Sequence, residues 1–394
     1  MVLSLRLEGS HLFSWNGELK FAFRATIVPE RVKPVPLDLF IVLDVSGSMG
    51  IIDNPPEVDD SLIAGTAEVD GHVVRYLKDD IGVNNRLEVA LEAIRNLLEN
   101  ADTSTRVTII TFSDHVNVLC RRVTPSTALE HLEEIVPDGN TALYSAVKKA
   151  ISLIDEHPAR VLLITDGYPT DVEDETEYSK LEVPRFSQFI PIGVGEYNAK
   201  ILRSLADLSN GRFYHVNDVS EISRIMEEER AKPSGGVKVR VDVLSKFPVN
   251  YVNYTPPIYI GTVEGVTRIY GFIQVPPKYS GELVRVKLTY TDTLDDREYS
   301  LEKFISVIPA TDSAQFVSGL NKYLLWEAEY YEKMKEISKL LESGMQVEAT
   351  RKMQELKDIA ERTRKADLIE ATKKLMNSSD EKEISSEITR KMRS

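Results

Sequence analysis

A carboxylate and two hydroxyls follow an apolar run near residue 44. Residues 41–48 read Ile-Val-Leu-Asp-Val-Ser-Gly-Ser, so Asp44, Ser46 and Ser48 alternate along a turn after an expected strand. Because alternate residues of such a turn point the same way, they offer a pocket made only of oxygen atoms. Oxygen-only pockets suit hard cations such as Mg²⁺ or Mn²⁺. We interpret Gly47 as the residue that lets the backbone turn sharply enough to aim both hydroxyls.

Two later segments each add one oxygen donor. Residues 138–142 read Asp-Gly-Asn-Thr-Ala and place Thr141 at the start of an expected helix. Residues 160–166 form a second apolar run that ends in Asp166. In open parallel sheets, ligands bind at the carboxyl ends of the strands. Asp44 and Asp166 both stand at such ends, so the expected fold and the expected site agree.

These three segments, in this order, resemble the von Willebrand factor A (vWA) domain and its metal-ion-dependent adhesion site. The resemblance implies that one divalent cation, Mg²⁺ or Mn²⁺, is surrounded by Asp44, Ser46, Ser48, Thr141 and Asp166. It also implies that the hydroxyls bind directly, that the two aspartates often act through waters, and that one position stays open for a partner's carboxylate or a water. The alternative is a degenerate site in which the motif only maintains loop geometry.

The segment 37–232 alternates expected strands and helices. Its strands are continuous apolar runs, which are typical of sheets covered on both faces and predict a doubly wound, Rossmann-like α/β domain. The expected strands are 37–44, 106–112, 116–120, 161–165, 189–194 and 212–216, and the expected helices are 86–99, 127–135, 142–156, 199–208 and 219–230.

Residues 233–310 and 1–36 share a different pattern. After a linker-like sequence at 232–236, apolar residues alternate with polar ones, which is typical of an antiparallel β-sandwich. The N-terminal segment alternates similarly, and a lone pair of strands would be only marginally stable. We therefore expect 1–36 to complete the sandwich, with the vWA domain inserted between its parts. This organisation resembles the trunk and sandwich of the inner-coat proteins of secretory transport vesicles.

From residue 311 the chain is expected to be helical to its end. Apolar residues recur at helical spacing from Phe316 to Leu341, and Gly344 is a good helix stop. The last ~15 residues of the region 311–394 are polar, so we expect a mobile tail. Tyr330, Tyr331 and Trp326 lie on or beside the apolar stripe, where core packing and a partner groove are both open interpretations.

An acidic insertion, residues 50–85, lies between the metal loop and the helix at 86–99. It is either a lid over the metal or a solvated loop, and the sequence leaves both open. A second acidic run follows Asp166 at 171–177, so the rim of the site attracts cations and repels acidic partners. The insertion has two basic residues, Arg75 and Lys78. Its acidic residues are Asp53, Glu57, Asp59, Asp60, Glu68, Asp70, Asp79 and Asp80.

Composition and charge exclude several classes of protein. The 394 residues carry a formal net charge of −14, which argues against a nucleic-acid surface. The single cysteine, Cys120, cannot form an intramolecular disulfide, which favours a reducing compartment. No apolar run has the length of a signal peptide or a membrane helix. We expect a soluble cytoplasmic protein, with a monomer as the default, that contacts neither nucleic acid nor membrane directly.

No residue pattern indicates an enzyme. The chain lacks a phosphate-binding Gly-x-x-x-x-Gly-Lys loop, a His-Glu-x-x-His helix and a Gly-x-Ser-x-Gly elbow. Its six histidines are scattered, with no metal-ligand spacing and no evident acidic partner. A hydrolase that used the metal would need a general base, and none is in view.

The C-terminal hydroxyls are the second feature with functional meaning. A phosphate group adds nearly two negative charges and three acceptor oxygens, which creates a docking point for a reader with basic pocket residues. The alternative is that these residues belong to a polar tail that is never modified. The expected phosphorylation sites are Thr350, Thr363, Thr372, Ser378, Ser379, Ser385, Ser386 and Thr389.

The chain as a whole resembles the ArnB group of archaeal cytoplasmic vWA proteins, which belong to the archaellum regulatory network. The likeness rests on length, the inserted vWA domain, the sandwich and the hydroxyl-rich helical end. It implies a non-enzymatic regulator that is phosphorylated by Ser/Thr protein kinases, dephosphorylated by a phosphatase, and bound by a forkhead-associated (FHA) domain partner to repress motility genes. The alternative is a vWA subunit of an AAA+ ATPase, of the magnesium-chelatase or MoxR type, that uses the metal site for assembly.

Overall fold

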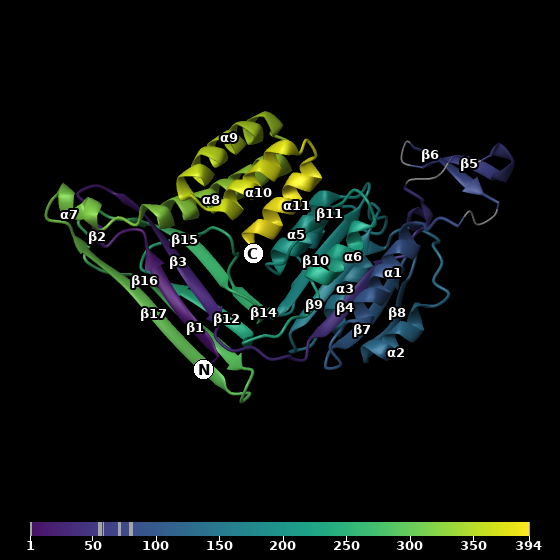
Figure 1. The fold of residues 1–394 in the computed structure, drawn as a ribbon, viewed down its shortest axis with the longest axis horizontal. Helices are drawn as coiled ribbons and strands as arrows, with labels where there is room; N and C mark the ends of the chain where they lie inside the picture. The colour runs from purple at the N-terminus through teal and green to yellow at the C-terminus, as the bar shows by residue number, and fades with distance from the viewer. Residues whose placement is uncertain (1, 54–56, 58, 70–71, 79–81, 394) are drawn as a thin grey trace.

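The computed structural model describes residues 2–53, 57, 59–69, 72–78 and 82–393. A β-sandwich and an α/β domain lie side by side, and a group of helices lies over both (Figure 1). The chain starts in the sandwich, passes through the α/β domain, returns to the sandwich and ends in the helices. The expected fold class is therefore confirmed. Within the described residues, no helix combines the length and the apolar character needed to cross a lipid bilayer.

The α/β domain is built on the strands β4 (Asp38–Asp44), β7 (Arg106–Phe112), β8 (Val116–Val123), β9 (Ala159–Thr165), β10 (Ser187–Val194) and β11 (Tyr214–Val216). They form one sheet in the order β11-β10-β9-β4-β7-β8, which is parallel except for the edge strand β8. Every residue of the central strand β4 is buried, as its unbroken apolar run predicts.

Helices cover both faces of this sheet. They are α1 (Arg86–Glu99), α2 (Pro125–Leu129), α3 (Leu143–Leu153), α4 (Glu175–Ser179), α5 (Ala199–Leu208) and α6 (Glu221–Glu228). Alternate residues of β4 enter two separate cores, because successive side chains of a strand point to opposite faces. Ile41 packs in the core that contains residues of α1 and α6, and Val42 packs in the core that contains residues of α3 and α5.

The sandwich consists of two packed sheets. One has the order β1-β3-β15-β13 and the other β14-β12-β16-β17-β2. The long pairing of β3 with β15 joins the N-terminal segment to the segment that follows the α/β domain. The strands are β1 (Leu3–Gly9), β2 (Phe13–Ser14), β3 (Leu19–Pro29), β12 (Gly236–Leu244), β13 (Val249–Tyr251), β14 (Ile258–Thr262), β15 (Thr267–Val275), β16 (Gly281–Asp292) and β17 (Glu298–Pro309).

The acidic insertion forms a hairpin that stands away from the α/β domain (Figure 1). It begins with two 3₁₀ turns, η1 (Gly47–Gly50) and η2 (Asp60–Leu62), and continues as β5 (Ile63–Val69) paired with β6 (His72–Leu77). Three of its expected rim acids, Asp70, Asp79 and Asp80, lie outside the described residues. The hairpin itself projects outward (Figure 1), and the contact with the expected metal site comes from Asp53, near the start of the insertion, through Arg86.

The helical region consists of α7 (Ser313–Ser318), α8 (Lys322–Glu342), α9 (Gln346–Thr363), α10 (Ala366–Asn377) and α11 (Glu381–Met392). From α8 onward, the helical region packs against the outer face of the four-stranded sheet, while α7 lies beside β2 (Figure 1). Tyr331 of α8 stacks on Tyr270 of β15 with ring centroids 4.8 Å apart. The buried carboxylate of Glu327 accepts hydrogen bonds from Arg24 and Tyr270, each at 2.7 Å. Tyr330 and Tyr331 are core residues, whereas Trp326 is half-buried beside Tyr323.

The last helix is packed, in contrast to the expected mobile tail. The helix α11 starts at a cap in which Asp380 accepts a hydrogen bond from Lys382 N. It lies beside β11, the edge strand of the α/β sheet (Figure 1). Ile384, Ile388 and Met392 recur every four residues and enter one core with residues of α8, α9 and α10. Three apolar residues at helical spacing thus give this segment a buried face, although its composition is otherwise polar.

The buried ring of His11 is expected to make the stability of the protein depend on pH. It stacks on Phe316, with ring centroids 5.4 Å apart, and its Nδ1 lies 2.8 Å from Ser10 Oγ. Burial lowers the pKa of His11 from 6.5 to about 4. The unfolded chain therefore takes up a proton near pH 6.5 that the folded chain takes up only near pH 4. His11 thus contributes fully to stability above pH 6.5, and its contribution is lost as the pH falls toward 4.

We expect His11→Gln to flatten this part of the stability curve, whose limiting slope is about 1.4 kcal/mol per pH unit for one proton. Urea unfolding of the full chain at several pH values between neutral pH and pH 4 measures the free energy of unfolding and hence this slope. The matched control is His131→Gln, because His131 is exposed. Equal slopes for the wild type and the His11 variant would show that another group causes the dependence.

Candidate metal centre

Asp44 is held at the carboxyl end of β4 by two donors. Its Oδ1 accepts a hydrogen bond from Ser46 N at 2.9 Å, and its Oδ2 accepts one from Thr165 Oγ1 at 2.5 Å. Thr165 is the last residue of β9, the strand beside β4. Two neighbouring strand ends therefore fix a fully buried carboxylate at the edge where such sheets bind ligands.

Ser46, Ser48 and Asp166 are in hydrogen-bonding contact at the same edge. The two serine Oγ atoms lie 3.1 Å apart, and Ser48 Oγ donates to Asp166 Oδ1 at 2.7 Å. Residues 47–50 form the 3₁₀ turn η1, and Gly47 does not adopt a positive φ. The sharp turn expected at Gly47 therefore comes from the 3₁₀ conformation and needs no left-handed residue.

Thr141 reaches the site from the loop before α3. A Cβ added to Gly167 would lie 2.9 Å from Thr141 Oγ1, so this hydroxyl lies against the residue that follows Asp166. The loop depends on Gly139, which has φ +76° and where a Cβ would meet Asp114 Oδ2 at 2.4 Å. The structure thus brings all five expected ligand residues to one end of the sheet, and their binding of a metal ion remains a prediction.

The donor set fits a hard divalent cation. The side-chain atoms in contact are carboxylate and hydroxyl oxygens, which Mg²⁺ and Mn²⁺ prefer. Burial, and then the charge of Asp166, raise the pKa of Asp44 to about 7. Burial also raises the pKa of Asp166, although Ser48 and Arg86 favour its charged form. Two buried carboxylates side by side cost free energy, and a bound cation would offset that cost.

The sequence pattern missed two residues that touch this site, Arg86 and Asp53. Arg86 Nη1 donates to Asp166 Oδ2 at 2.7 Å, while Nε and Nη2 donate to Asp53 Oδ1 at 2.8 and 2.6 Å. Asp53 belongs to the acidic insertion, so the insertion reaches the site through this arginine. An arginine at the start of a helix has no local signature that separates it from a solvated one, and only the fold reveals its partners.

The acidic run after Asp166 also has a structural role. Asp171 accepts hydrogen bonds from Tyr144 N at 3.2 Å and from Ser145 N at 2.8 Å. These are first-turn amides of α3, whose own N-cap residue, Ala142, provides no side-chain acceptor. Part of the expected rim charge is therefore used to cap the helix that carries Thr141 at its start.

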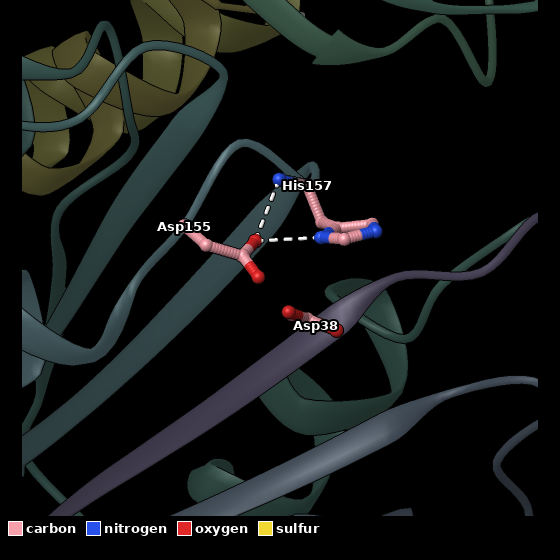
Figure 2. A group of neighbouring side chains, drawn as sticks. All are labelled: Asp38, Asp155 and His157. Atoms are coloured by element: carbon pink, nitrogen blue, oxygen red, sulfur yellow. Dashed lines mark hydrogen bonds and ion pairs between the residues drawn. The ribbon is translucent and has the colours of Figure 1, made fainter.

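A second acidic cluster lies at the other end of β4 (Figure 2). Ligand atoms of Asp38, Asp155 and His157 all lie within 4.8 Å of one another, a spacing that could hold a metal ion. Arg122 forms ion pairs with both aspartates, and Asp155 Oδ1 lies 2.6 Å from His157 Nδ1. Burial alone would raise the pKa of Asp155, but hydrogen bonds from His157 and the charge of Arg122 lower it to about 2.

Arg122 already supplies a positive charge to this second cluster, so we interpret it as an ion-pair network. The contact between His157 and Asp155 shows that the expectation of histidines without acidic partners was wrong. Besides His157, His215 Nε2 lies 3.3 Å from Asp380 Oδ2. The Asp-x-His spacing at 155–157 was the available signal, whereas the pairing of His215 with Asp380 depends on α11 reaching β11.

The eight expected phosphorylation sites differ in burial. Thr350 and Ser379 are exposed, and Ser378 is half-buried. The other five, which were expected on an exposed tail, are buried in the structure: Thr363, Thr372, Ser385, Ser386 and Thr389. Their hydroxyls form hydrogen bonds within the protein, because α9, α10 and α11 turn these residues toward the core or toward the α/β domain.

Hydroxyls of α11 bind the open edge of the α/β sheet. Ser386 Oγ accepts a hydrogen bond from His215 N at 3.1 Å. Thr389 Oγ1 lies 3.3 Å from Phe213 N and 3.1 Å from Phe213 O. Arg203 Nη1 donates to Ser385 Oγ at 3.0 Å. Ser386 and Thr389 thus satisfy backbone groups in and next to β11, which is an edge strand of the sheet among the described residues.

Two family models match parts of the chain. The model of the von Willebrand factor type A domain matches residues 39–168, and the model of the archaellum regulatory network B, C-terminal domain matches residues 322–394. The first range contains all five expected metal ligands, and the second contains all eight expected phosphorylation sites. None of the curated proteins matches the chain.

Solved structures match over most of the chain. The ArnB paralog VWA2 from Sulfolobus acidocaldarius superposes with a TM-score of 0.81 and 25% sequence identity, covering 100% of this chain and 98% of that chain. A von Willebrand factor type A protein from Catenulispora acidiphila superposes with a TM-score of 0.64 and 15% identity, covering 94% and 89%. For the human COPII-coat protein Sec24c the TM-score is 0.49 and the identity 9%, covering 94% and 59%.

Proposed function

We propose that this ArnB-like vWA protein is a non-enzymatic regulator that acts by binding other proteins. Ser/Thr protein kinases phosphorylate its C-terminal helical region, and a phosphatase reverses the modification. An FHA-domain partner binds the phosphorylated form, and the two together repress expression of the archaellum. The match of residues 322–394 to the archaellum regulatory network B model supports this proposal.

The observation that carries the proposal is the position of Thr350 within that matched region. Thr350 is an exposed threonine near the start of α9, and among the described residues its Oγ1 donates only to Gln346 O, at 3.0 Å. The N-cap residue of α9, Met345, provides no side-chain cap, so the first turns of the helix can unwind at low free-energy cost. The unwound segment could then bind in the active site of a kinase. Met345 and Val347 are exposed beside it and offer apolar area to a partner.

The metal site has a structural part in the proposal. Asp44, Ser46, Ser48, Thr141 and Asp166 would hold Mg²⁺ or Mn²⁺, and the bound ion would supply the positive charge that two buried carboxylates need. The ion would thereby keep the loops at 44–50, 138–142 and 165–170 in one arrangement.

The proposal is tested by binding of an FHA-domain protein to the full chain, with and without kinase treatment. We expect phosphorylation to strengthen binding at least on the order of tenfold, and Thr350→Val to remove that gain. The matched control is Thr103→Val, because Thr103 is exposed in the α/β domain. Point variants are preferable to truncation at residue 310, which would uncover the apolar sheet face beneath α8.

If Thr350→Val keeps the gain, Ser378 and Ser379 are the other accessible sites, and all three are then replaced together. Phosphorylation-dependent binding by that triple variant would exclude the accessible hydroxyls and refute the proposal. The alternative function, assembly with an AAA+ ATPase through the metal site, makes a different prediction. There Asp44→Asn abolishes assembly, whereas in our proposal it leaves phosphorylation-dependent binding in place.

A further inference from the structure

We propose that Arg86 is a built-in cation that competes with the divalent ion for Asp166 and couples the ion site to the acidic insertion. This inference rests on the metal binding proposed above and adds a regulatory contact to it. Three features of the described residues support it: the enclosure of the guanidinium, its fixed backbone position, and its sharing of Asp166 with the metal-binding hydroxyls.

The guanidinium of Arg86 is enclosed on three sides. Asp166 accepts a hydrogen bond from Nη1 at 2.7 Å, and Asp53 accepts from Nε and Nη2 at 2.8 and 2.6 Å. Gly195 lies against it, because a Cβ added there would be 2.8 Å from Nη2. The side chain of Arg86 is 13% exposed and that of Asp166 is 0% exposed. A charge in such surroundings is weakly screened by solvent and salt.

The backbone fixes Arg86 at the base of the insertion. Asn85 and Glu88 form a capping box at the start of α1, so Arg86 is the first residue of a well-capped helix. Its backbone N donates to Ile51 O at 2.9 Å, directly after η1. Ile51 lies at the start of the insertion and Arg86 directly follows its end, so this hydrogen bond joins the two ends of the insertion at the α/β domain.

Asp166 is shared between the expected ion site and Arg86. Its Oδ1 accepts from Ser48, one of the expected metal ligands, while its Oδ2 accepts from Arg86. A divalent ion beside Ser48 would lie close to the guanidinium, and the two positive charges would repel each other. Binding of the ion therefore favours release of Arg86 from Asp166, and the presence of Arg86 weakens binding of the ion.

The carboxylate of Asp53 is held by the same guanidinium of Arg86. Its Oδ1 accepts only from Arg86, and its buried Oδ2 has no hydrogen-bond partner among the described residues. If Arg86 shifts, this carboxylate loses its counter-charge and becomes costly to bury. Ion binding is therefore expected to loosen the insertion around residue 53. The conformation of the insertion at the rim of the domain would then depend on whether the ion is bound.

The first test is titration of the purified full chain with Mg²⁺, or with Mn²⁺ followed by electron paramagnetic resonance. We expect Arg86→Gln to bind the ion on the order of tenfold more tightly than wild type. Arg86→Lys keeps a positive charge near Asp166 and should bind close to wild type. The matched control is Arg95→Gln, an exposed arginine of the same helix.

The second test is hydrogen exchange in the insertion. Adding the ion to wild type should speed exchange of amides at 51–53 and 59–69, whereas Arg86→Gln should exchange fast with or without the ion. Equal or weaker ion binding by Arg86→Gln, with wild-type binding intact, overturns the inference and leaves the metal site standing. If neither protein binds Mg²⁺ or Mn²⁺ at millimolar concentration, the metal site itself is refuted and the inference falls with it.

Discussion

We expect Mg²⁺ to stabilise the protein and the change Asp44→Asn to abolish that stabilisation. The wild type should gain about 2–3 kcal/mol at ion concentrations near 100 times Kd, because only the folded chain has the assembled site. The amide introduced by this change can still accept from Ser46 N and can donate to Thr165 Oγ1, so the loop should keep its shape. What is lost is the carboxylate charge at the end of β4, without which the remaining donors hold a divalent ion poorly.

Thermal unfolding with Mg²⁺ and with a chelator measures this effect. In chelator, Asp44→Asn should be at least as stable as wild type, because the variant no longer buries a second carboxylate beside Asp166. The matched control is Asp138→Asn, the same change at an exposed residue of the rim. An unchanged Mg²⁺ response in Asp44→Asn would place the ion elsewhere and leave the motif as a device of loop geometry.

The change Thr389→Asp should detach α11 from the α/β sheet, at a cost of about 3 kcal/mol or more. Thr389 Oγ1 is buried, 3.3 Å from Phe213 N and 3.1 Å from Phe213 O. A carboxylate there could accept from the amide but would face the carbonyl with its own negative charge. Release of the helix would also free Ser385 and Ser386, the two other hydroxyls of α11 that are buried at this interface.

Limited trypsin digestion and hydrogen exchange of α11 measure the release. Lys382 and Arg390 provide cleavage sites within the helix, and both form ion pairs with the α/β domain in the packed state. The matched control is Ser379→Asp, because Ser379 is exposed just before α11 and should not affect protection. If Thr389→Asp leaves α11 as protected as in wild type, the hydroxyl contacts with β11 contribute little, and apolar packing alone holds the helix.

The sites of the Asp44→Asn and Thr389→Asp predictions differ in how far their surroundings could be inferred from the sequence. The residues of the expected metal site stand at the ends of apolar runs or at a helix start, and these patterns depend on neighbours in the chain. A run such as 38–44 predicts a buried strand, and a parallel sheet brings strand ends together. The positions of Asp44, Ser46, Ser48, Thr141 and Asp166 at one end of the sheet therefore follow from the sequence pattern.

The C-terminal hydroxyls could not be anticipated in the same way. The polar composition of 380–394 suggested an exposed tail, yet Ser385, Ser386 and Thr389 are buried. Ser386 and Thr389 bind backbone groups in or next to β11, and Ser385 accepts from the side chain of Arg203 in α5. Burial of a hydroxyl is decided by what lies opposite it, and here that is the backbone of an edge strand about 170 residues earlier in the chain. Amphipathic spacing predicts a helix and its apolar face, and carries no information about the partner of the polar face.

By itself, the sequence determined the fold class and indicated which residues gather at the carboxyl end of β4. These follow from short-range periodicity, because each helix or strand must bury one face or both. Only the tertiary structure decided that Arg86 joins Asp53 to Asp166 and that the hydroxyls of α11 bind β11. Charges and hydroxyls acquire their partners when distant segments pack, and the free energy of such a pair depends on burial that no local pattern records.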